Sequence, residues 1–293
     1  MRSFPIAKIN LGLNIVAKRP DGYHDLETVF MPVNITDTLD VQASDGPTGC
    51  DISLTGVSIE GDPRRNLVVR AYELLATEFQ LPHVSATLHK RIPTQAGMGG
   101  GSSDAAYMLM MLNDMFCLGL SQQQLTERAA KLGADCPFFI MRQPSYGEGI
   151  GERLSPVSTT LGNGSEWLLA VVKPPIAVST REAFSQVVPK RPAINCREVV
   201  TTMPVSQWRQ HLTNDFEPSV FALHPELATL KRTIYDKGAA YAAMSGSGSA
   251  MFGLFHRESV GAGDHNDDVQ LLHSRLHSAI PADSQLFIVS TES

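Results

Sequence analysis

The chain has 293 residues, of which 43% are hydrophobic and 18% charged, and its formal net charge at pH 7 is −6. This length suggests about two domains with full hydrophobic cores, and the composition excludes an intrinsically disordered chain. The acidic balance excludes a global basic field of the kind that binds nucleic acid, although it leaves room for a local phosphate site.

The cysteines and the apolar runs predict a cytoplasmic protein. No two of the four cysteines form a Cys-x-x-Cys pair, so we expect reduced thiols rather than a zinc site. The longest apolar run, 105–112, is far shorter than the roughly 20 residues that a membrane helix needs. Lys8, Asn10 and Asn14 interrupt the apolar stretch that a signal peptide would require.

The first predicted element is a strand over residues 6–15, where apolar and polar residues alternate. The odd positions from 7 to 15 are apolar and form a core face. The opposite face carries Lys8, Asn10 and Asn14, which by themselves indicate a solvated face.

The later elements mix strands and helices without a regular alternation. We expect a turn at 19–22, strands at 29–43, 50–57 and 84–90, a helix from Asn66 to about 79, a buried helix at 102–116, and a helix that begins at the capping box of Ser121 and Gln124 and ends at Gly133. After a region rich in Ser, Pro, Gly and Asn at 145–165, we expect strands at 167–173, 239–244, 251–255 and 286–289, with helices at 226–237 and 269–280. This order predicts the α+β class, with a domain boundary between 1–153 and 154–293.

The segment that carries most chemical information lies between a predicted strand and the buried helix. Four of the five residues 97–101 are glycine, which is favourable where a backbone approaches a ligand closely. The helix that follows offers free N–H groups and the positive end of its dipole, so the segment predicts a di- or triphosphate site. The alternative is a flexible turn followed by a helix cap.

Familiar nucleotide and hydrolase motifs do not fit this segment. A Walker loop needs Gly-Lys, which the chain lacks, and a dinucleotide fingerprint that starts at Gly97 would need glycine where Ser102 stands. Neither a Gly-x-Ser-x-Gly nucleophile elbow nor a His-Glu-x-x-His motif occurs.

Two further segments suggest chemistry. Asp135 lies between small residues and an apolar run, where a carboxylate can accept a proton, bind a metal or simply cap a helix. Residues 245–248, Ser-Gly-Ser-Gly, separate two predicted strands and suit either a tight hairpin or a second loop near phosphates.

These three segments, with Lys8 and Asn10 on the first strand, resemble the GHMP kinases, a family named after galactokinase, homoserine kinase, mevalonate kinase and phosphomevalonate kinase. The family's second motif is similar to residues 93–103, with Met98 in place of Leu, and its third motif is similar to residues 245–248. The resemblance implies a two-domain α+β fold, with a ribosomal-protein-like N-terminal domain over 1–153, a ferredoxin-like C-terminal domain over 154–293 and an active site in the cleft between them.

A narrower resemblance spans positions 7 to about 255, which is most of the chain. It rests on residues 7–11, 19–24, 66–67, 96–106, 133–139 and 147–152, and it indicates a GHMP kinase that phosphorylates a cytidine-diphosphate-linked polyol with ATP. The chain departs from that pattern at Cys136, where a branched apolar residue is typical, and at Ser249, where proline is typical.

The resemblance assigns roles to individual residues. It implies that Asp135 is the catalytic base and that Lys8 lies beside it, keeps it ionised and stabilises charge on the transferred phosphoryl group. ATP would be bound by Asn66, Leu67 and Lys90 and by the glycine-rich loop of Pro93, Thr94, Gln95, Ala96, Gly97, Met98, Gly99, Gly100, Gly101, Ser102 and Ser103.

The resemblance also implies magnesium bound to the ATP phosphates, for which Ser103 is a candidate ligand. The polyol substrate would contact Asn10, Tyr23, His24 and Phe184, where Tyr23 can stack on cytosine, His24 can form a hydrogen bond and Phe184 can form the other face.

Two alternatives remain open from the sequence. The chain could be another small-alcohol GHMP kinase, of the homoserine or mevalonate type, or a nucleotide-binding protein without catalytic activity. A pure binding protein would not need Lys8 and Asp135 together. We expect no nucleic-acid or membrane partner, and either a monomer or a homodimer.

Overall fold

The computed structural model describes all residues except 60, 163–165, 262 and 292–293. The chain folds into two compact units that interleave along the sequence. Unit 1 consists of residues 1–8, 35–94 and 99–143, and unit 2 consists of residues 9–34, 95–98 and 144–293. The domain boundary near residue 153 stays a prediction.

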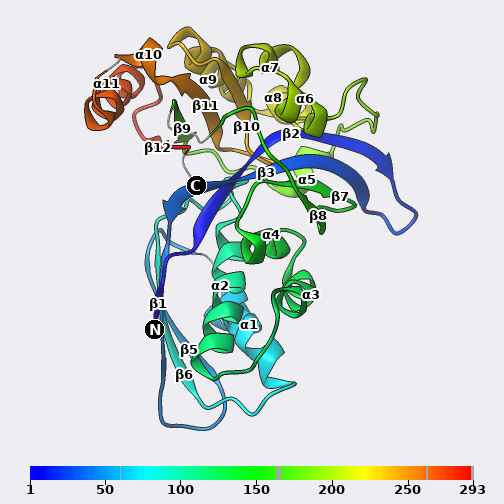
Figure 1. The fold of residues 1–293 in the computed structure, drawn as a ribbon, viewed down its shortest axis with the longest axis vertical. Coiled ribbons are helices and arrows are strands. Elements are labelled where there is room, and N and C mark those ends of the chain that lie inside the picture. Colours follow the sequence, from blue (N-terminus) through cyan, green and yellow to red (C-terminus); the bar gives the residue numbers. More distant parts are fainter. Residues whose placement is uncertain (60, 163–165, 262, 292–293) are drawn as a thin grey trace. The chain divides into compact units, whose positions relative to one another are not determined.

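Unit 1 is a four-stranded sheet with a layer of helices (Figure 1). The strand order is β1 (Arg2–Ser3), β4 (Thr38–Ala43), β6 (Val84–Lys90) and β5 (Cys50–Gly56); β4 is antiparallel to its neighbours, and β5 is parallel to β6. The helical layer consists of η1 (Pro63–Arg65), α1 (Leu67–Ala76), α2 (Gly100–Met115), α3 (Gln122–Leu132) and α4 (Cys136–Met141). Alternate residues of β4 and β6, such as Leu39, Val41 and Leu88, are buried and form the core.

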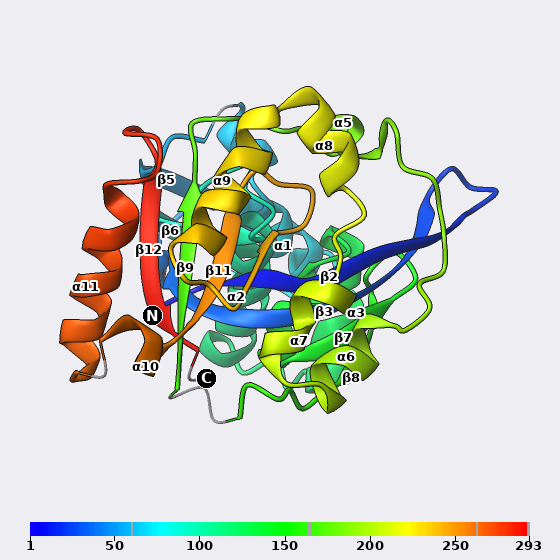
Figure 2. The ribbon, with the colours of Figure 1, turned by 90° about the horizontal axis from the view of Figure 1, so that it is seen from above.

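Unit 2 contains two sheets. One has the order β10 (Tyr241–Met244), β11 (Met251–His256), β9 (Trp167–Lys173) and β12 (Gln285–Ser290), and all of its pairs are antiparallel. Two helices, α9 (Pro225–Asp236) and α11 (His265–His277), lie against one face of it (Figure 2). The other sheet has the order β2 (Ile6–Lys18), β3 (His24–Thr36), β7 (Ser145–Glu148) and β8 (Arg153–Pro156); the first residues of β2 and the last of β3 belong to unit 1.

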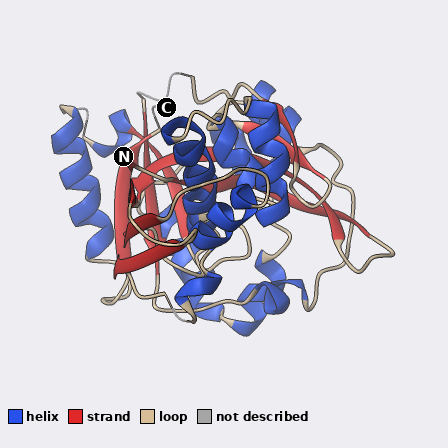
Figure 3. Cartoon of the chain, turned by 90° about the horizontal axis from the view of Figure 1, so that it is seen from below, coloured by secondary structure: helices blue, strands red, loops and turns tan. Residues whose placement is uncertain are grey.

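Short helices complete unit 2. They are α5 (Thr180–Phe184), α6 (Cys196–Thr202), α7 (Val205–His211), α8 (Glu217–Leu223) and α10 (Arg257–Val260). Helices and strands are thus mixed along the chain, and the predicted α+β class is confirmed (Figure 3). Within the described residues, no helix combines the length and apolar character that a membrane span requires.

Predictions that depend on local chemistry are confirmed. Asn66 caps α1 by accepting the N–H of Val68 at 2.9 Å, and Ser121 and Gln124 form the expected capping box of α3. The turn at 19–22 is also present, with the N–H of Gly22 bonded to the carbonyl of Arg19.

The structure differs from the expected secondary structure in three places. The expected strand 29–43 is divided between β3 and β4, which belong to different sheets, because Asp37 leaves the strand and accepts the backbone N–H groups of Arg91 and Ile92. The region 145–165, where the composition suggested the domain boundary, contains β7 and β8. The segment between the expected elements 251–255 and 269–280 contains α10 and the first turn of α11, whose N-cap is Asp264.

Candidate active site

The central feature of the site in unit 1 is an ion pair between Lys8 and Asp135. The Nζ atom of Lys8 lies 3.6 Å from Oδ2 of Asp135, and the two side chains are 4% and 35% exposed. Burial lowers the pKa of Lys8, and the charge of Asp135 opposes that shift. The pair therefore consists of a buried cation and a carboxylate that remains accessible to a ligand.

Local structure explains why these two side chains meet. Lys8 lies on β2, whose alternation directs the side chain of every second residue to the same face. Asp135 precedes α4, but its carboxylate extends to Lys8 instead of capping that helix. The capping role that the sequence left open for Asp135 is thus replaced by an ion pair.

The end of the glycine-rich loop lies against the same pair. Gly99 is the N-cap of α2 and has a left-handed φ of 70°. A Cβ atom at Gly99 would lie 2.7 Å from the ring of Phe139 and 3.3 Å from Cγ of Lys8. Glycine at this position therefore allows the N-terminus of α2, with its free N–H groups, to approach Lys8.

The middle of the glycine-rich loop belongs to unit 2, where it contacts residues 245–250. A Cβ atom at Gly97 would lie 1.8 Å from the carbonyl oxygen of Ser245, and the hydroxyl of Ser245 donates to the carbonyl of Gly97 at 2.9 Å. The N–H groups of Ser249 and Ala250 donate to the carbonyls of Gln95 and Ala96, each at 3.3 Å. Residues 245–248 are thus both a hairpin connection and a neighbour of the glycine-rich loop.

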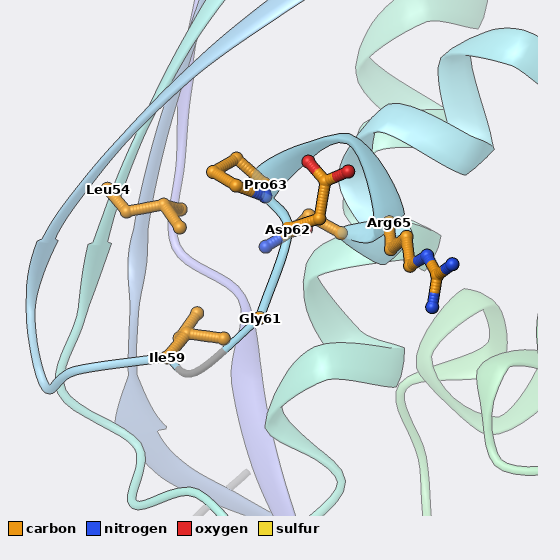
Figure 4. Close-up of a pocket in the computed structure, with 7 residues that line it drawn as sticks. Leu54, Ile59, Gly61, Asp62, Pro63 and Arg65 are labelled. Atoms are coloured by element: carbon orange, nitrogen blue, oxygen red, sulfur yellow. The ribbon is translucent and has the colours of Figure 1, made fainter.

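A pocket of about 230 Å³ in unit 1 is lined in part by Asn66, one of the residues expected to bind ATP (Figure 4). It is lined by Leu54, Ile59, Gly61, Asp62, Pro63, Arg65 and Asn66. Leu54, Ile59 and Pro63 face the space, whereas the side chain of Arg65 points away from these apolar residues. The neighbouring Leu67 lies close to the end of the glycine-rich loop. A Cβ atom at Gly101 would be 3.7 Å from Cδ1 of Leu67.

Lys90, predicted to lie near ATP, takes part in a buried ion cluster. Its ammonium group donates to Asp104 at 2.7 Å and also to Asp37. Burial raises the pKa of Asp104, and the charge of Lys90 opposes that shift. The structure therefore shows Lys90 as a link between β6 and α2, and its contact with ATP stays a prediction.

The predicted substrate residues all lie in unit 2, and the structure brings two of them together. The ring of His24 stacks on Phe184 with centroids 4.7 Å apart, while Tyr23 is 61% exposed. Asn10 is buried and donates its amide to the hydroxyl of Thr28 at 2.9 Å. The roles of all four in substrate binding stay predictions.

The possible metal ligand at the start of α2 is a serine rather than an acidic cluster. Among the described residues, no three His, Cys, Asp or Glu side chains are arranged to hold a metal. The buried hydroxyl of Ser103 has no hydrogen-bond partner within that same set of residues. An orphaned oxygen of this kind fits the oxygen ligands that magnesium prefers.

Three buried polar residues were not predicted from the sequence: Asp37, Asp104 and Asn214. Each bonds to another segment of the chain. The only signal for Asp37 was a charged residue inside an otherwise strand-like run.

Comparisons with known proteins agree with this arrangement. Models of the GHMP kinase N-terminal and C-terminal domains match residues 66–143 and 203–276. A 4-diphosphocytidyl-2-C-methyl-D-erythritol kinase of Bacteroides fragilis is 51% identical over 88% of this chain and 93% of its own. The enzyme of the same name from Bacteroides thetaiotaomicron is 48% identical over 89% of this chain and 94% of its own.

Solved structures give the same result. A crystal structure of 4-(cytidine 5'-diphospho)-2C-methyl-D-erythritol kinase matches with a TM-score of 0.78 and 30% identity, and the match covers 99% of both chains. A homoserine kinase from Cytophaga hutchinsonii matches with a TM-score of 0.69 over 97% of this chain and 94% of its own; at 16% identity it shares the fold alone.

Proposed function

This chain belongs to the GHMP kinases, and from that premise we propose that it transfers the γ-phosphate of ATP to the C2 hydroxyl of 4-(cytidine 5'-diphospho)-2-C-methyl-D-erythritol. The observation that carries the proposal is the Lys8–Asp135 pair beside the N-terminus of α2, in a chain 51% identical to a kinase named for that substrate. The reaction belongs to the non-mevalonate pathway of isoprenoid precursors.

In the proposed reaction Asp135 accepts the proton of the attacking hydroxyl. Its carboxylate is partly exposed, as an acceptor for a substrate proton must be. Lys8 pairs with Asp135 and places a positive charge next to the transferred phosphoryl group. Phosphoryl transfer depends mainly on such positioning and charge stabilisation.

ATP is proposed to bind with its phosphates at the glycine-rich loop and at the N-terminus of α2. The pocket lined by Asn66, with Leu67 adjacent, supports a place for the adenine in unit 1. Magnesium, when bound, would neutralise charge on the phosphates, and the hydroxyl of Ser103 is the protein oxygen proposed to reach it.

The cytidyl group is proposed to be recognised in unit 2. Tyr23 supplies an exposed flat face on which cytosine stacks, and His24 supplies a hydrogen bond to the edge of the base. Phe184, which packs on His24, supplies an apolar wall of the same site. Asn10 remains a proposed substrate contact.

A substrate panel tests the function. Release of ADP is followed with ATP and magnesium in the presence of the cytidyl substrate, mevalonate, homoserine or galactose, one at a time. Turnover with the cytidyl compound alone is the expected result. Turnover with another alcohol would keep a GHMP kinase but reject this substrate, and ATP binding without any turnover would favour a non-catalytic protein.

A further inference from the structure

The side chain of Asn214 connects two segments of unit 2 that the chain separates widely. It is 3% exposed, and its amide nitrogen donates to the carbonyls of Met244 and Gly246, each at 2.8 Å. Its amide oxygen accepts the N–H of Phe216 at 3.0 Å. Both ends of the side chain are therefore engaged, and the two carbonyls that it holds flank Ser245.

The backbone around Asn214 is itself fixed by β2. Leu13 exchanges two hydrogen bonds of 2.8 Å with this segment, one to the carbonyl of Thr213 and one from the N–H of Asp215. The carboxylate of Asp215 also accepts the N–H of Ile15 at 2.8 Å. Asn214 is thus anchored to a core strand, so its amide group is a stationary support for the 244–246 segment.

That segment in turn fixes the middle of the glycine-rich loop. The carbonyls of Gln95, Ala96 and Gly97 all accept hydrogen bonds from residues 245–250, and the hydroxyl of Ser245 makes the bond to Gly97. In a planar trans peptide the C=O and the following N–H point in opposite directions. The N–H groups of residues 96, 97 and 98 consequently point away from the groups of residues 245–250 that bond to these carbonyls.

We propose that Asn214 is a positioning residue for ATP: by holding the carbonyls on either side of Ser245, it seats Ser245 on Gly97 and orients the loop N–H groups toward the phosphates. This inference rests on the proposed binding of ATP at the loop. Replacing a residue in this role changes the affinity for ATP although the residue does not contact ATP. The affinity for the alcohol substrate should stay unchanged.

The test compares Asn214→Ala with the matched control Asn195→Ala. Asn195 lies in the same unit and also uses its side chain as an acceptor, but it caps α6. We expect Asn214→Ala to raise both the Kd measured by calorimetry for ATP with magnesium and the KM for ATP by about tenfold, the result of losing roughly one to two net hydrogen bonds. The KM for the cytidyl substrate should change less than twofold, and Asn195→Ala should leave ATP binding unchanged.

A double-mutant cycle with Ser245→Ala tests whether Asn214 affects ATP binding through Ser245. If Asn214 acts through Ser245, the double variant loses much less ATP affinity than the sum of the two single losses. Additive losses would overturn the proposal, and so would an Asn214→Ala variant that binds ATP as tightly as the wild type.

Two further measurements keep the test decisive. If Asn214→Ala does not fold, Asn214→Asp retains the shape and the acceptor for Phe216 but turns an oxygen toward the two carbonyls, and it should show the same loss of ATP affinity. If the wild type binds ATP but does not phosphorylate the cytidyl substrate, the proposed function fails, whereas the calorimetric comparison still decides the role of Asn214.

Discussion

The ammonium group of Lys90 and the carboxylate of Asp104 are bonded at 2.7 Å in the core of unit 1, and each side chain is 3% exposed. Asp37 completes the cluster and also accepts the N–H groups of Arg91 and Ile92. The cluster therefore joins the end of β6, the segment that follows it and the first turn of α2, which are the elements between which the glycine-rich loop extends.

Replacing Lys90 should destabilise the protein strongly. Lys90→Met leaves two buried carboxyl groups without their cation, so we expect a loss of about 3–5 kcal/mol in the free energy of unfolding, measured with urea. The control Lys131→Met removes an exposed lysine from α3 and should change stability by less than about 0.5 kcal/mol. A Lys90→Met protein as stable as the control would show that the cluster does not support the fold.

A side chain at Gly99 should be unfavourable for two reasons: the backbone angle φ is left-handed, and a Cβ atom would clash with a neighbour. Gly99 and Gly119 both have a φ of 70°, but only at Gly99 would a Cβ meet a neighbour, the ring of Phe139 at 2.7 Å. Both alanine variants incur a left-handed strain of roughly 1–2 kcal/mol. We expect Gly99→Ala alone to raise the KM for ATP and to lower the melting temperature further; equal effects at the two sites would contradict the proposed packing.

Asp135→Asn should remove catalysis and leave ATP binding intact. An amide cannot accept the proton of the attacking hydroxyl, so we expect kcat to fall by about 100-fold to 10,000-fold. Loss of the carboxylate also removes the charge that opposes the burial of Lys8, so the pKa of Lys8 should fall further. The control Asp114→Asn, at an exposed position of α2, should retain full activity, and a wild-type kcat in Asp135→Asn would reject its role as base.

Tyr23→Ala should affect the KM for the cytidyl substrate but not the KM for ATP. Because Tyr23 is proposed to stack on cytosine, its loss should raise the KM for the cytidyl substrate by about tenfold, while the KM for ATP stays within twofold. Phe4→Ala removes another exposed aromatic ring and serves as the control. Equal changes in both KM values would count against stacking.

The cysteine next to the proposed base should be chemically inert. Burial raises the pKa of Cys136 from 9.0 to about 11, which at pH 8 leaves about a hundredfold less thiolate than an ordinary cysteine has. Cys117 is exposed, and iodoacetamide should modify it first. Mass spectrometry of the native protein at pH 8 checks this order; rapid modification of Cys136, with loss of activity, would indicate a redox-sensitive site.

The parts of the site that depend on neighbouring residues could be predicted from the sequence. The glycine-rich loop, the cap at Asn66 and the capping box at Ser121 all follow from short-range chemistry. The Lys8–Asp135 pair spans more than a hundred residues, and only the resemblance to a family suggested it. No periodicity or spacing in the sequence predicts that Asp37 bonds to Lys90 or Asn214 to Met244, because these residues become neighbours only when the chain folds.

The interleaving of the two units has a consequence for how the protein is made. The backbone N–H of Ile15 needs the carboxylate of Asp215, a partner 200 residues later in the chain. At a translation rate of roughly 5–20 residues per second, this segment leaves the ribosome about 10–40 seconds before its partner exists. This part of β2 is therefore synthesised early, but it forms its final hydrogen bonds only after residue 215 has been added.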